Sequence, residues 1–284
     1  MSLRDEFVPV SRERACPICE RRDWCLVSRE GGPEPVAAIC PRTESPIRWG
    51  GAGWLHRLQG DAPRPRRRGV ELEPVPVDHR REAERLARGA NLDPVAASLG
   101  LPSSVLRRLL VGFGEDFFGP FSSWPQFDEE LRVVGISLRR TDGSKRLRSG
   151  DRAGLHVPID LPDDLSRERI LVVEGGSDAA AGLALGRLAV GRHSVLACFK
   201  ELKRLLRRRR PGAISIVADR EEHGAGLRGA EQLARVLSVV SPDVRLVEPP
   251  PGVKDLRAWL AAGLRSAELS RIEAAAPRIA EAAR

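Results

Sequence analysis

The chain has 284 residues, 42% of them hydrophobic, with a formal net charge of +8 and a pI of about 10.0. Its length allows one large or two modest domains, and no apolar run approaches the roughly 18–20 residues of a membrane span. The charged start, MSLRDEFVPVSRER, lacks the apolar core of a secretion signal, so we expect a cytoplasmic protein without a membrane segment. Tyrosine is absent, which excludes a tyrosine nucleophile in this chain.

The positive charge favours a polyanionic partner, because neutralising phosphates releases their counterions. An arginine-rich base composition explains the same charge without any nucleic acid. Charge alone therefore does not decide between the two interpretations.

Four cysteines lie close together in CPICERRDWCLVSREGGPEPVAAIC, at Cys16, Cys19, Cys25 and Cys40. The first two have the C-x2-C spacing of a zinc knuckle, and four thiolates complete a tetrahedral Zn²⁺ site with no open position. We predict a structural zinc site, because a reducing compartment disfavours disulfides. His56 is an alternative to one of the cysteines.

Residues 1–58 are therefore predicted to form a zinc-binding module whose folding depends on the metal. Trp24, Arg42 and Arg48 surround the site, and such side chains suit phosphates and stacked bases. The alternative is that the tryptophans pack a small core. Residues 59–80 are rich in proline and charge and are predicted to form an extended linker with a basic cluster at 64–68.

Residues 81–165 are predicted to form a small basic α+β subdomain. Apolar residues first recur at helical spacing. The stretch ELRVVGISLRRTDGSKRLRSG then alternates as a hairpin, with Asp142-Gly143 at its turn. Lys145, Arg146 and Arg148 are candidate contacts for template or nucleotide. A solvated edge strand, protected from aggregation by its charges, is the alternative.

Residues 166–264 alternate four times between strand and helix, which predicts an open parallel α/β sheet with right-handed crossovers. The run ILVV is continuous and apolar, as in a strand buried on both faces. Ser177 is the expected N-cap of the helix that follows it. Residues 265–284 are predicted to form a C-terminal helix.

Two of these predicted strands end in acidic residues. ILVV leads into Glu174, and ISIVA leads into Asp219, with Glu221 and Glu222 just beyond. Ligands of open α/β sheets bind at the carboxyl ends of the strands. If the strands are neighbours, these carboxylates converge, and a hard cation such as Mg²⁺ relieves their repulsion. The alternative, a lone acid that caps a helix, explains one such ending better than two.

The sequence VEGGSDAAAG followed by VADREEHG resembles the Toprim domain, with its E-G-x-x-D and later D-x-D-x-x-G. The first motif fits Glu174, Gly175 and Asp178, and the second fits Asp219, Glu221 and Gly224, with glutamate in place of the second aspartate. The order of zinc module, basic segment and Toprim is similar to that of zinc-binding, Toprim-containing DNA primases, especially the compact forms of phages and mobile elements. The resemblance extends to about Leu264.

The resemblance implies a site and an activity. Glu174, Asp219 and Glu221 would be the catalytic residues, with Glu174 as the family's conserved acid, and all three would bind catalytic Mg²⁺ or Mn²⁺. Asp178, Gly175, Gly224 and Glu222 would support the site. The activity would be template-directed synthesis of short oligoribonucleotide primers from nucleoside triphosphates on single-stranded DNA during DNA replication. The longer Glu221 side chain and the extra Ala225-Gly226 before the next helix depart from the family pattern.

No G-x-x-x-x-G-K-[ST] motif is present, so the chain contains no P-loop motor and would need a replicative helicase in trans. Two other functions remain open for a zinc-plus-Toprim chain. One is a metal-dependent nuclease, and the other is a non-catalytic DNA-binding clamp. A self-sufficient topoisomerase is excluded, because the chain has no tyrosine.

Overall fold

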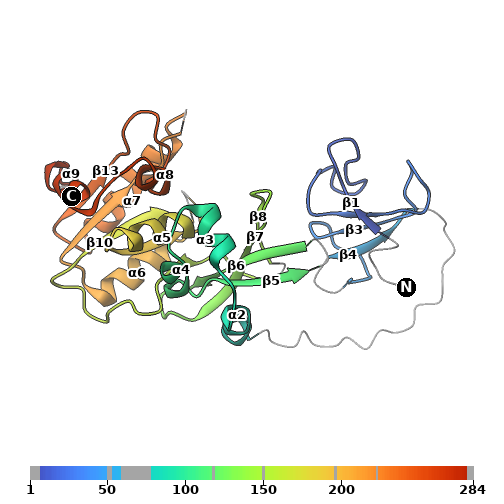
Figure 1. Cartoon of the computed structure of the whole chain (residues 1–284), viewed down its shortest axis with the longest axis horizontal. Coiled ribbons are helices and arrows are strands. Elements are labelled where there is room, and N and C mark those ends of the chain that lie inside the picture. Colours follow the sequence, from blue (N-terminus) through green and yellow to red (C-terminus); the bar gives the residue numbers. More distant parts are fainter. Residues whose placement is uncertain are drawn as a thin grey trace. The chain divides into compact units, whose positions relative to one another are not determined.

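The structure, a computed structural model, describes residues 7–49, 53–58, 78–116, 119–148, 151–194, 197–221 and 223–279. The chain divides into two compact units: the first takes in Met1–Val77 and two short segments, Glu115–Pro120 and Arg148–Gly150, and the second takes in the rest. Figure 1 shows both units, with their helices and strands labelled where there is room. Among the described helices, none combines the length and the apolar composition needed to cross a bilayer.

The first unit contains a four-stranded antiparallel sheet in the order β1-β2-β3-β4. Its strands are β1 (Phe7–Pro9), β2 (Leu26–Ser28), β3 (Ala37–Cys40) and β4 (Trp54–Arg57). Neighbouring side chains of a strand point to opposite faces, and Leu26 and Val27 accordingly lie in different apolar clusters. One cluster contains the buried cysteines, and the other contains Phe7, Ile39 and Leu55.

The second unit is built on a nine-stranded mixed sheet. Its strands are β5 (Gly112–Asp116), β6 (Gly119–Phe127), β7 (Val133–Arg139), β8 (Lys145–Leu147), β9 (Leu155–His156), β10 (Arg169–Glu174), β11 (Leu188–Arg192), β12 (Ala213–Val217) and β13 (Val244–Val247). Its helices are α2 (His79–Ala87), α3 (Asp93–Leu99), α4 (Ser103–Arg108), α5 (Gly176–Ala184), α6 (Phe199–Arg209), α7 (Ala225–Leu237), α8 (Leu256–Ala261) and α9 (Ser266–Ala275).

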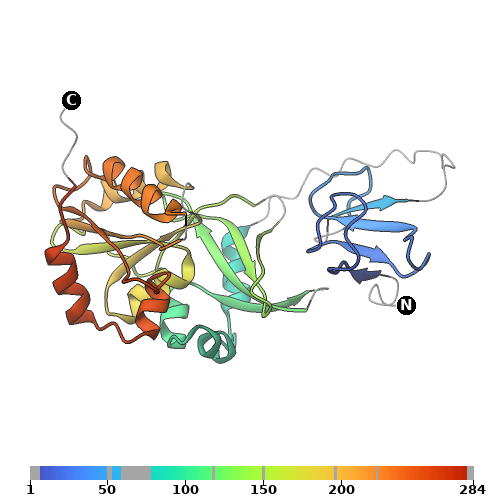
Figure 2. The same ribbon diagram turned by 90° about the horizontal axis from the view of Figure 1, so that it is seen from above.

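The predicted parallel sheet is present as β13-β12-β10-β11. The strand β10 lies inside it, and its side chains alternate between two cores. Ile170 and Val172 pack with α6 and α7, whereas Leu171 and Val173 pack with α5 and α8. Figure 2 shows helices on both sides of this sheet. Burial on both faces explains why ILVV is apolar without alternation.

The sheet continues beyond its parallel part. The strand β9 pairs antiparallel with β11 and with β6, and β6, β7 and β8 extend the sheet as an antiparallel meander. One sheet therefore crosses the expected subdomain boundary at residue 165. The predicted hairpin forms from β7 and β8, and Gly143 takes the left-handed φ of 83° that its tight turn requires.

The structure differs from the sequence-based predictions at three helix starts. The helix α5 begins directly after Gly175, so Ser177 lies inside the helix and does not cap it. Ala225 and Gly226 are the first residues of α7 and not an insertion before it. The helix α2 begins at His79, within the expected linker. The rest of that linker, with its basic cluster, and Glu222 lie outside the described residues.

Candidate functional site

The four cysteines of the first unit come together. Their sulfur atoms all lie within 4.8 Å of one another, with 3.6 Å between Cys19 and Cys25 and 3.9 Å between Cys25 and Cys40. Zn–S bonds of about 2.3 Å in a tetrahedron require sulfurs about 3.8 Å apart. The donor set and its spacing therefore suit Zn²⁺. His56 is not part of the cluster, because its Nε2 lies 3.0 Å from the carbonyl oxygen of Thr43.

The thiols differ in their surroundings. Burial raises the pKa of Cys25 and of Cys16. Burial acts in the same direction on Cys19, but the backbone N–H of Arg21 and the neighbouring thiols outweigh it and lower the pKa of Cys19 to about 7. Four thiolates in one small core repel one another, so a bound cation is needed to hold all four in the deprotonated form.

Arg42 belongs to this cluster in the structure. Its guanidinium donates to the sulfur of Cys25 at 3.5 Å and of Cys19 at 3.8 Å, and it also bonds Asp23. Donors of this kind orient metal ligands from outside the first coordination sphere. The contact with nucleic acid that the sequence suggested for Arg42 remains a prediction.

The tryptophans of the first unit have different surroundings. Trp49 packs against the second apolar cluster, with its ring 6.3 Å from that of Phe7. The exposed Arg48 lies over the Trp54 ring, 5.8 Å from its centroid. Trp24 is half-buried beside Cys25. The arrangement leaves Arg48 as the more accessible candidate for a phosphate contact, which stays a prediction.

In the second unit, acidic residues gather at the carboxyl edge of the parallel sheet. Glu174 is the last residue of β10, and Asp219 follows β12 by two residues. The two strands pair in parallel, from Arg169 opposite Ala213 to Val172 opposite Ile216. Parallel pairing places both strand ends at the same edge of the sheet.

Glycines allow the chain to turn tightly at this edge. Gly175 has φ of 82°, a conformation that L side chains rarely adopt. At Gly176 a Cβ would lie 2.6 Å from the Trp124 ring, so a larger residue would displace α5 from the sheet. At Gly226 a Cβ would lie 2.2 Å from the carbonyl oxygen of Asp219. These glycines bring two helix N-termini close to the acidic residues.

The carboxylates at this edge raise one another's pKa. Burial raises the pKa of Asp219 to about 8, and repulsion from Asp178, Glu174 and Asp255 adds to the shift, while Lys254 opposes it. Burial likewise raises the pKa of Asp178 to about 7, with a further contribution from Asp255. Closely placed acids with few counter-charges form a site that a divalent cation stabilises.

The acidic residues do not all contribute equally to this cluster. Glu221 is exposed and is not among the main charges that act on Asp219. Within the described ranges, the four cysteines are the one group of potential ligands whose atoms all lie within 4.8 Å of one another, so the carboxylates are more widely spaced. Gly224 supports the turn before α7 with φ of 63°.

Asp178 and Asp255 also organise the helices around the site. The Oδ1 of Asp178 accepts the backbone N–H of Arg257 at 2.9 Å, and Asp255 caps α8 by accepting the N–H of Ala258 at 2.7 Å. Sequence reasoning missed Asp255 and Lys254. The available signal was an aspartate at a helix start, in the loop that follows the last parallel strand.

A pocket of about 290 Å³ adjoins the acidic residues. Gly175 and Gly176 form one wall, and Arg139, Lys145 and Arg146 from the β7–β8 hairpin contribute positive charge to another. Burial and Arg139 lower the pKa of Lys145, while Asp178 opposes the shift. The hairpin cations are therefore within electrostatic reach of the acids. Arg148, at the end of the hairpin, does not line this pocket.

Buried polar side chains line or adjoin this pocket. The Nε2 atoms of Gln126 and His156 lie 3.1 Å apart, and the Trp124 ring meets His156 edge-on. Burial lowers the pKa of His156 to about 3, so this ring is neutral. His193 also lines the pocket, directly after β11. Sequence reasoning missed both histidines, although the position of His193 at a strand end was visible.

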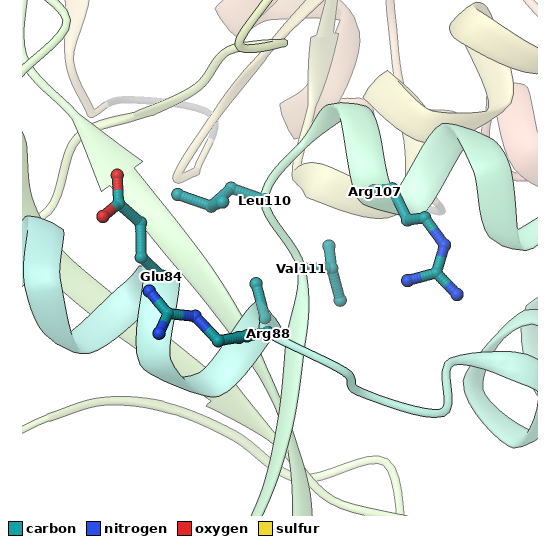
Figure 3. A pocket seen from close by; sticks show the side chains of 6 residues that line it. Glu84, Arg88, Arg107, Leu110 and Val111 are labelled. Atoms are coloured by element: carbon teal, nitrogen blue, oxygen red, sulfur yellow. The ribbon is translucent and has the colours of Figure 1, made fainter.

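A separate hollow of about 370 Å³ lies between α2 and α4. Its floor is apolar, and Figure 3 shows Arg88 and Arg107 extending on either side of Leu110 and Val111. The acidic residues of the sheet edge do not line it.

The chain is similar in structure to the zinc-binding and RNA polymerase domains of the Aquifex aeolicus primase. The TM-score is 0.55 at 16% identity, over 69% of this chain and 60% of that one, so less than two thirds of the Aquifex chain is spanned. A DnaG primase catalytic domain bound to ssDNA gives a TM-score of 0.51 at 16% identity, over 70% of this chain and 83% of the other. No protein-family model and no curated protein sequence matches this chain.

A third similar chain comes from a structure of bacteriophage T7 lagging-strand DNA polymerase with the primase domains of two gp4 subunits. It gives a TM-score of 0.52 at 17% identity, over 64% of this chain and 91% of the other.

The chain has the fold of a DnaG-type primase core. The expected order of a zinc-binding module and a Toprim-type parallel sheet is confirmed, and so is the resemblance to primases at the level of the fold. Within the primase fold, the acidic edge and the basic pocket belong to one sheet, and the pocket joins the loop after β10 to the β7–β8 hairpin.

The raised carboxyl pKa values of this primase fold predict a pH-dependent stability. The folded-state pKa values of Asp178 and Asp219, about 7 and about 8, exceed the unfolded value of about 3.9. Between pH 4 and pH 8 the native state therefore binds more protons than the unfolded state. The stability that the two protonated aspartates contribute is fully present below pH 4 and is lost as the pH rises to 8. Asp219→Asn is expected to raise the Tm at pH 8 without Mg²⁺ and to flatten its decline with pH.

The measurement is a series of melting curves from pH 5 to pH 8. Each kcal/mol corresponds to about 2–4 °C for a domain of this size, and we expect a shift of that order. The protein is desalted rather than chelated, because a chelator would also remove zinc. Glu231→Gln on α7 serves as the control. Parallel declines of Tm in wild type and Asp219→Asn would contradict the prediction.

Proposed function

We propose that the chain is a primase-like nucleotidyltransferase that synthesises short oligoribonucleotide primers on single-stranded DNA. The observation that carries the proposal is the acidic edge beside a basic pocket on the primase fold. Acidic residues supply ligands for a divalent cation, and the basic side chains neutralise phosphates. A chain that binds nucleoside triphosphates beside a divalent cation needs both.

Each group then has a role. Glu174, Asp178 and Asp219 would hold Mg²⁺ or Mn²⁺, with Glu221 reaching in from its exposed turn. The bound cation would lower the barrier to attack by a 3′ hydroxyl and offset charge on the triphosphate and the departing pyrophosphate. Arg139 and Lys145, which line the pocket, would orient the triphosphate. Glu174 would position the metal or accept a proton beside it.

The zinc module would hold the single-stranded template. Arg48 over Trp54 offers a cation beside an aromatic face, which suits phosphates and stacked bases. The similar structures include a primase domain bound to ssDNA and primase domains bound to an RNA/DNA hybrid and dTTP. A replicative helicase supplied in trans would open the duplex for this chain.

The test is incubation of the zinc-loaded chain with single-stranded DNA, labelled ribonucleotides and either Mg²⁺ or Mn²⁺. Oligoribonucleotides that lengthen with time would support primer synthesis. Shortening of the template would instead identify a nuclease, and tight binding with neither product would identify a DNA clamp. A mixture without nucleotides separates cleavage from synthesis.

A further inference from the structure

The helix α6 carries two groups of cations that differ in their partners. On one side, Arg204 pairs with Glu129 at 2.7 Å and Arg208 pairs with Glu130 at 2.6 Å. These pairs fasten the helix to the turn between β6 and β7. The second group is Lys200, Lys203 and Arg207, and none of these makes an ion pair within the part of the chain that the structure describes.

The second group forms one stripe. At about 100° per residue, Lys200, Lys203 and Arg207 fall within an arc of about 60° on the helix. The buried side chains Leu202, Leu205 and Leu206 face the core from the other side. Lys200 and Arg207 are exposed and Lys203 is partly exposed. We call these three residues the α6 stripe, and it extends for about 10 Å along the helix.

Ordinary helix chemistry explains only part of the α6 stripe. Cations near a helix C-terminus are stabilised by the dipole, which accounts for Arg207. Lys200 is the second residue of α6, where the dipole disfavours positive charge. Ion pairs with glutamates offset the charges of Arg204 and Arg208, but Lys200 and Lys203 have no such ion pair among the described residues. Lys200 is therefore placed at a cost to the helix, whereas the dipole neither favours nor opposes Lys203, which lies beyond the first turn.

An arginine-rich composition does not explain them either. The chain contains four lysines, Lys145, Lys200, Lys203 and Lys254. Lys145 lines the pocket beside the acidic residues, and Lys254 acts on the charge of Asp219. The other two begin the α6 stripe. Lysine is a compact, mobile point charge that binds phosphate without fixed geometry.

The α6 stripe begins next to the acidic edge. Glu174 lies opposite Arg192 in the pairing of β10 with β11, and Arg192 interacts with the charges of both Glu174 and Asp219. The Arg192 guanidinium lies over the Phe199 ring, 5.1 Å from its centroid. Phe199 is the first residue of α6 and Lys200 follows it. The α6 stripe therefore leads away from the acidic site along one face of the sheet.

We propose that the α6 stripe binds the phosphate backbone of the nucleic-acid duplex that leaves the acidic site. The inference rests on the proposed function, because template-directed synthesis produces a duplex next to the carboxylates. Three cations over about 10 Å match two or three successive phosphates of one strand. Because the product can have any base sequence, its binding site must not read the bases, and contacts with the phosphate backbone meet this requirement.

The test compares wild type with the triple variant Lys200→Ala, Lys203→Ala and Arg207→Ala. The probe is a labelled RNA–DNA hybrid duplex, with single-stranded DNA of equal length as the second probe, and binding is measured by anisotropy at several salt concentrations. We expect duplex affinity to fall on the order of 10- to 100-fold near 0.1 M salt, and the salt slope to fall by about 2–3. Single-stranded DNA should lose much less affinity.

The control variant removes three charges elsewhere, through Arg235→Ala, Arg265→Ala and Arg271→Ala on and beside α7 and α9. Alanine favours helix, so both variants should keep the wild-type Tm. An unchanged duplex salt slope in the α6 variant, or an equal loss on single-stranded DNA, would overturn the proposal.

The stripe and the proposed function can fail separately. Formation of the first dinucleotide should be unaffected by the triple variant, because the α6 stripe does not touch the acidic residues. If the wild type makes primers but the salt slope of its duplex binding equals that of the triple variant, only the proposed role of the α6 stripe is refuted. A wild type that binds the duplex through the α6 stripe but makes no primers refutes primer synthesis alone.

Discussion

Glu174→Gln and Asp219→Asn are each expected to reduce primer synthesis by about 100-fold or more while the protein stays folded. Each change replaces a charged ligand by a neutral amide of almost the same shape. Removal of one preorganised charge from a site of this kind typically costs about 10²–10³ in rate. Because the acids act on one another, the loss in the double variant should be smaller than the product of the single losses.

The measurement is the initial rate of labelled dinucleotide formation on single-stranded DNA at saturating Mg²⁺. Glu231→Gln makes the same chemical change on α7, away from the acidic edge, and should keep the wild-type rate. Melting curves confirm that each variant is folded. Full activity in both folded acid variants would falsify the assignment of this site. The effect of Glu221→Gln should be smaller than that of Asp219→Asn, because Glu221 is exposed.

The parallel part of the fold could be predicted because its physical requirements are local. A strand buried on both faces needs consecutive apolar residues, and β10 supplies Ile170 to Val173. A helix on such a sheet needs an apolar stripe, and α6 supplies Leu202, Leu205 and Leu206. The acidic ends of two strands were likewise visible. The structure was needed to establish that β10 and β12 are neighbours.

Other parts of the site depend on contacts that the sequence does not encode locally. Asp255 lies in a proline-rich loop, and only the fold brings it near Asp178 and Asp219. The strands β5 and β6 come from a segment rich in glycine, phenylalanine and proline, which lacks the alternation of an ordinary strand. Ser177 had the chemistry of an N-cap, but the tight turn at Gly175 places the helix start before it.

The division of the second unit into two subdomains stays a prediction. One sheet runs through both expected segments, since β9 pairs with β11 on one side and β6 on the other. This continuity places the β7–β8 hairpin beside the loop after β10. The basic pocket is thus a product of long-range strand pairing, and composition could predict its charge but not its position.

Loss of zinc is expected to unfold the first unit and leave the second intact. The first unit has two small apolar clusters, one of which contains the buried Cys16, Cys25 and Cys40. Zinc bound by four thiolates contributes about 10–16 kcal/mol to the folding of small zinc domains, which such a core cannot replace. Purified protein should contain one zinc per chain. Cys25→Ser should lower that content to near zero, because a buried hydroxyl is a poor ligand for zinc.

The control for this prediction is the fifth cysteine. Cys198 belongs to the second unit, where its thiol donates to the carbonyl oxygen of Gly154 at 3.3 Å. Cys198→Ser should keep one zinc per chain and a protease-resistant first unit. Limited proteolysis of Cys25→Ser, or of chelated wild type, should digest residues 7–58 and spare a fragment from about Asp78 onward. A first unit that resists protease without zinc would show that its apolar clusters suffice, and the cysteines would then need another explanation.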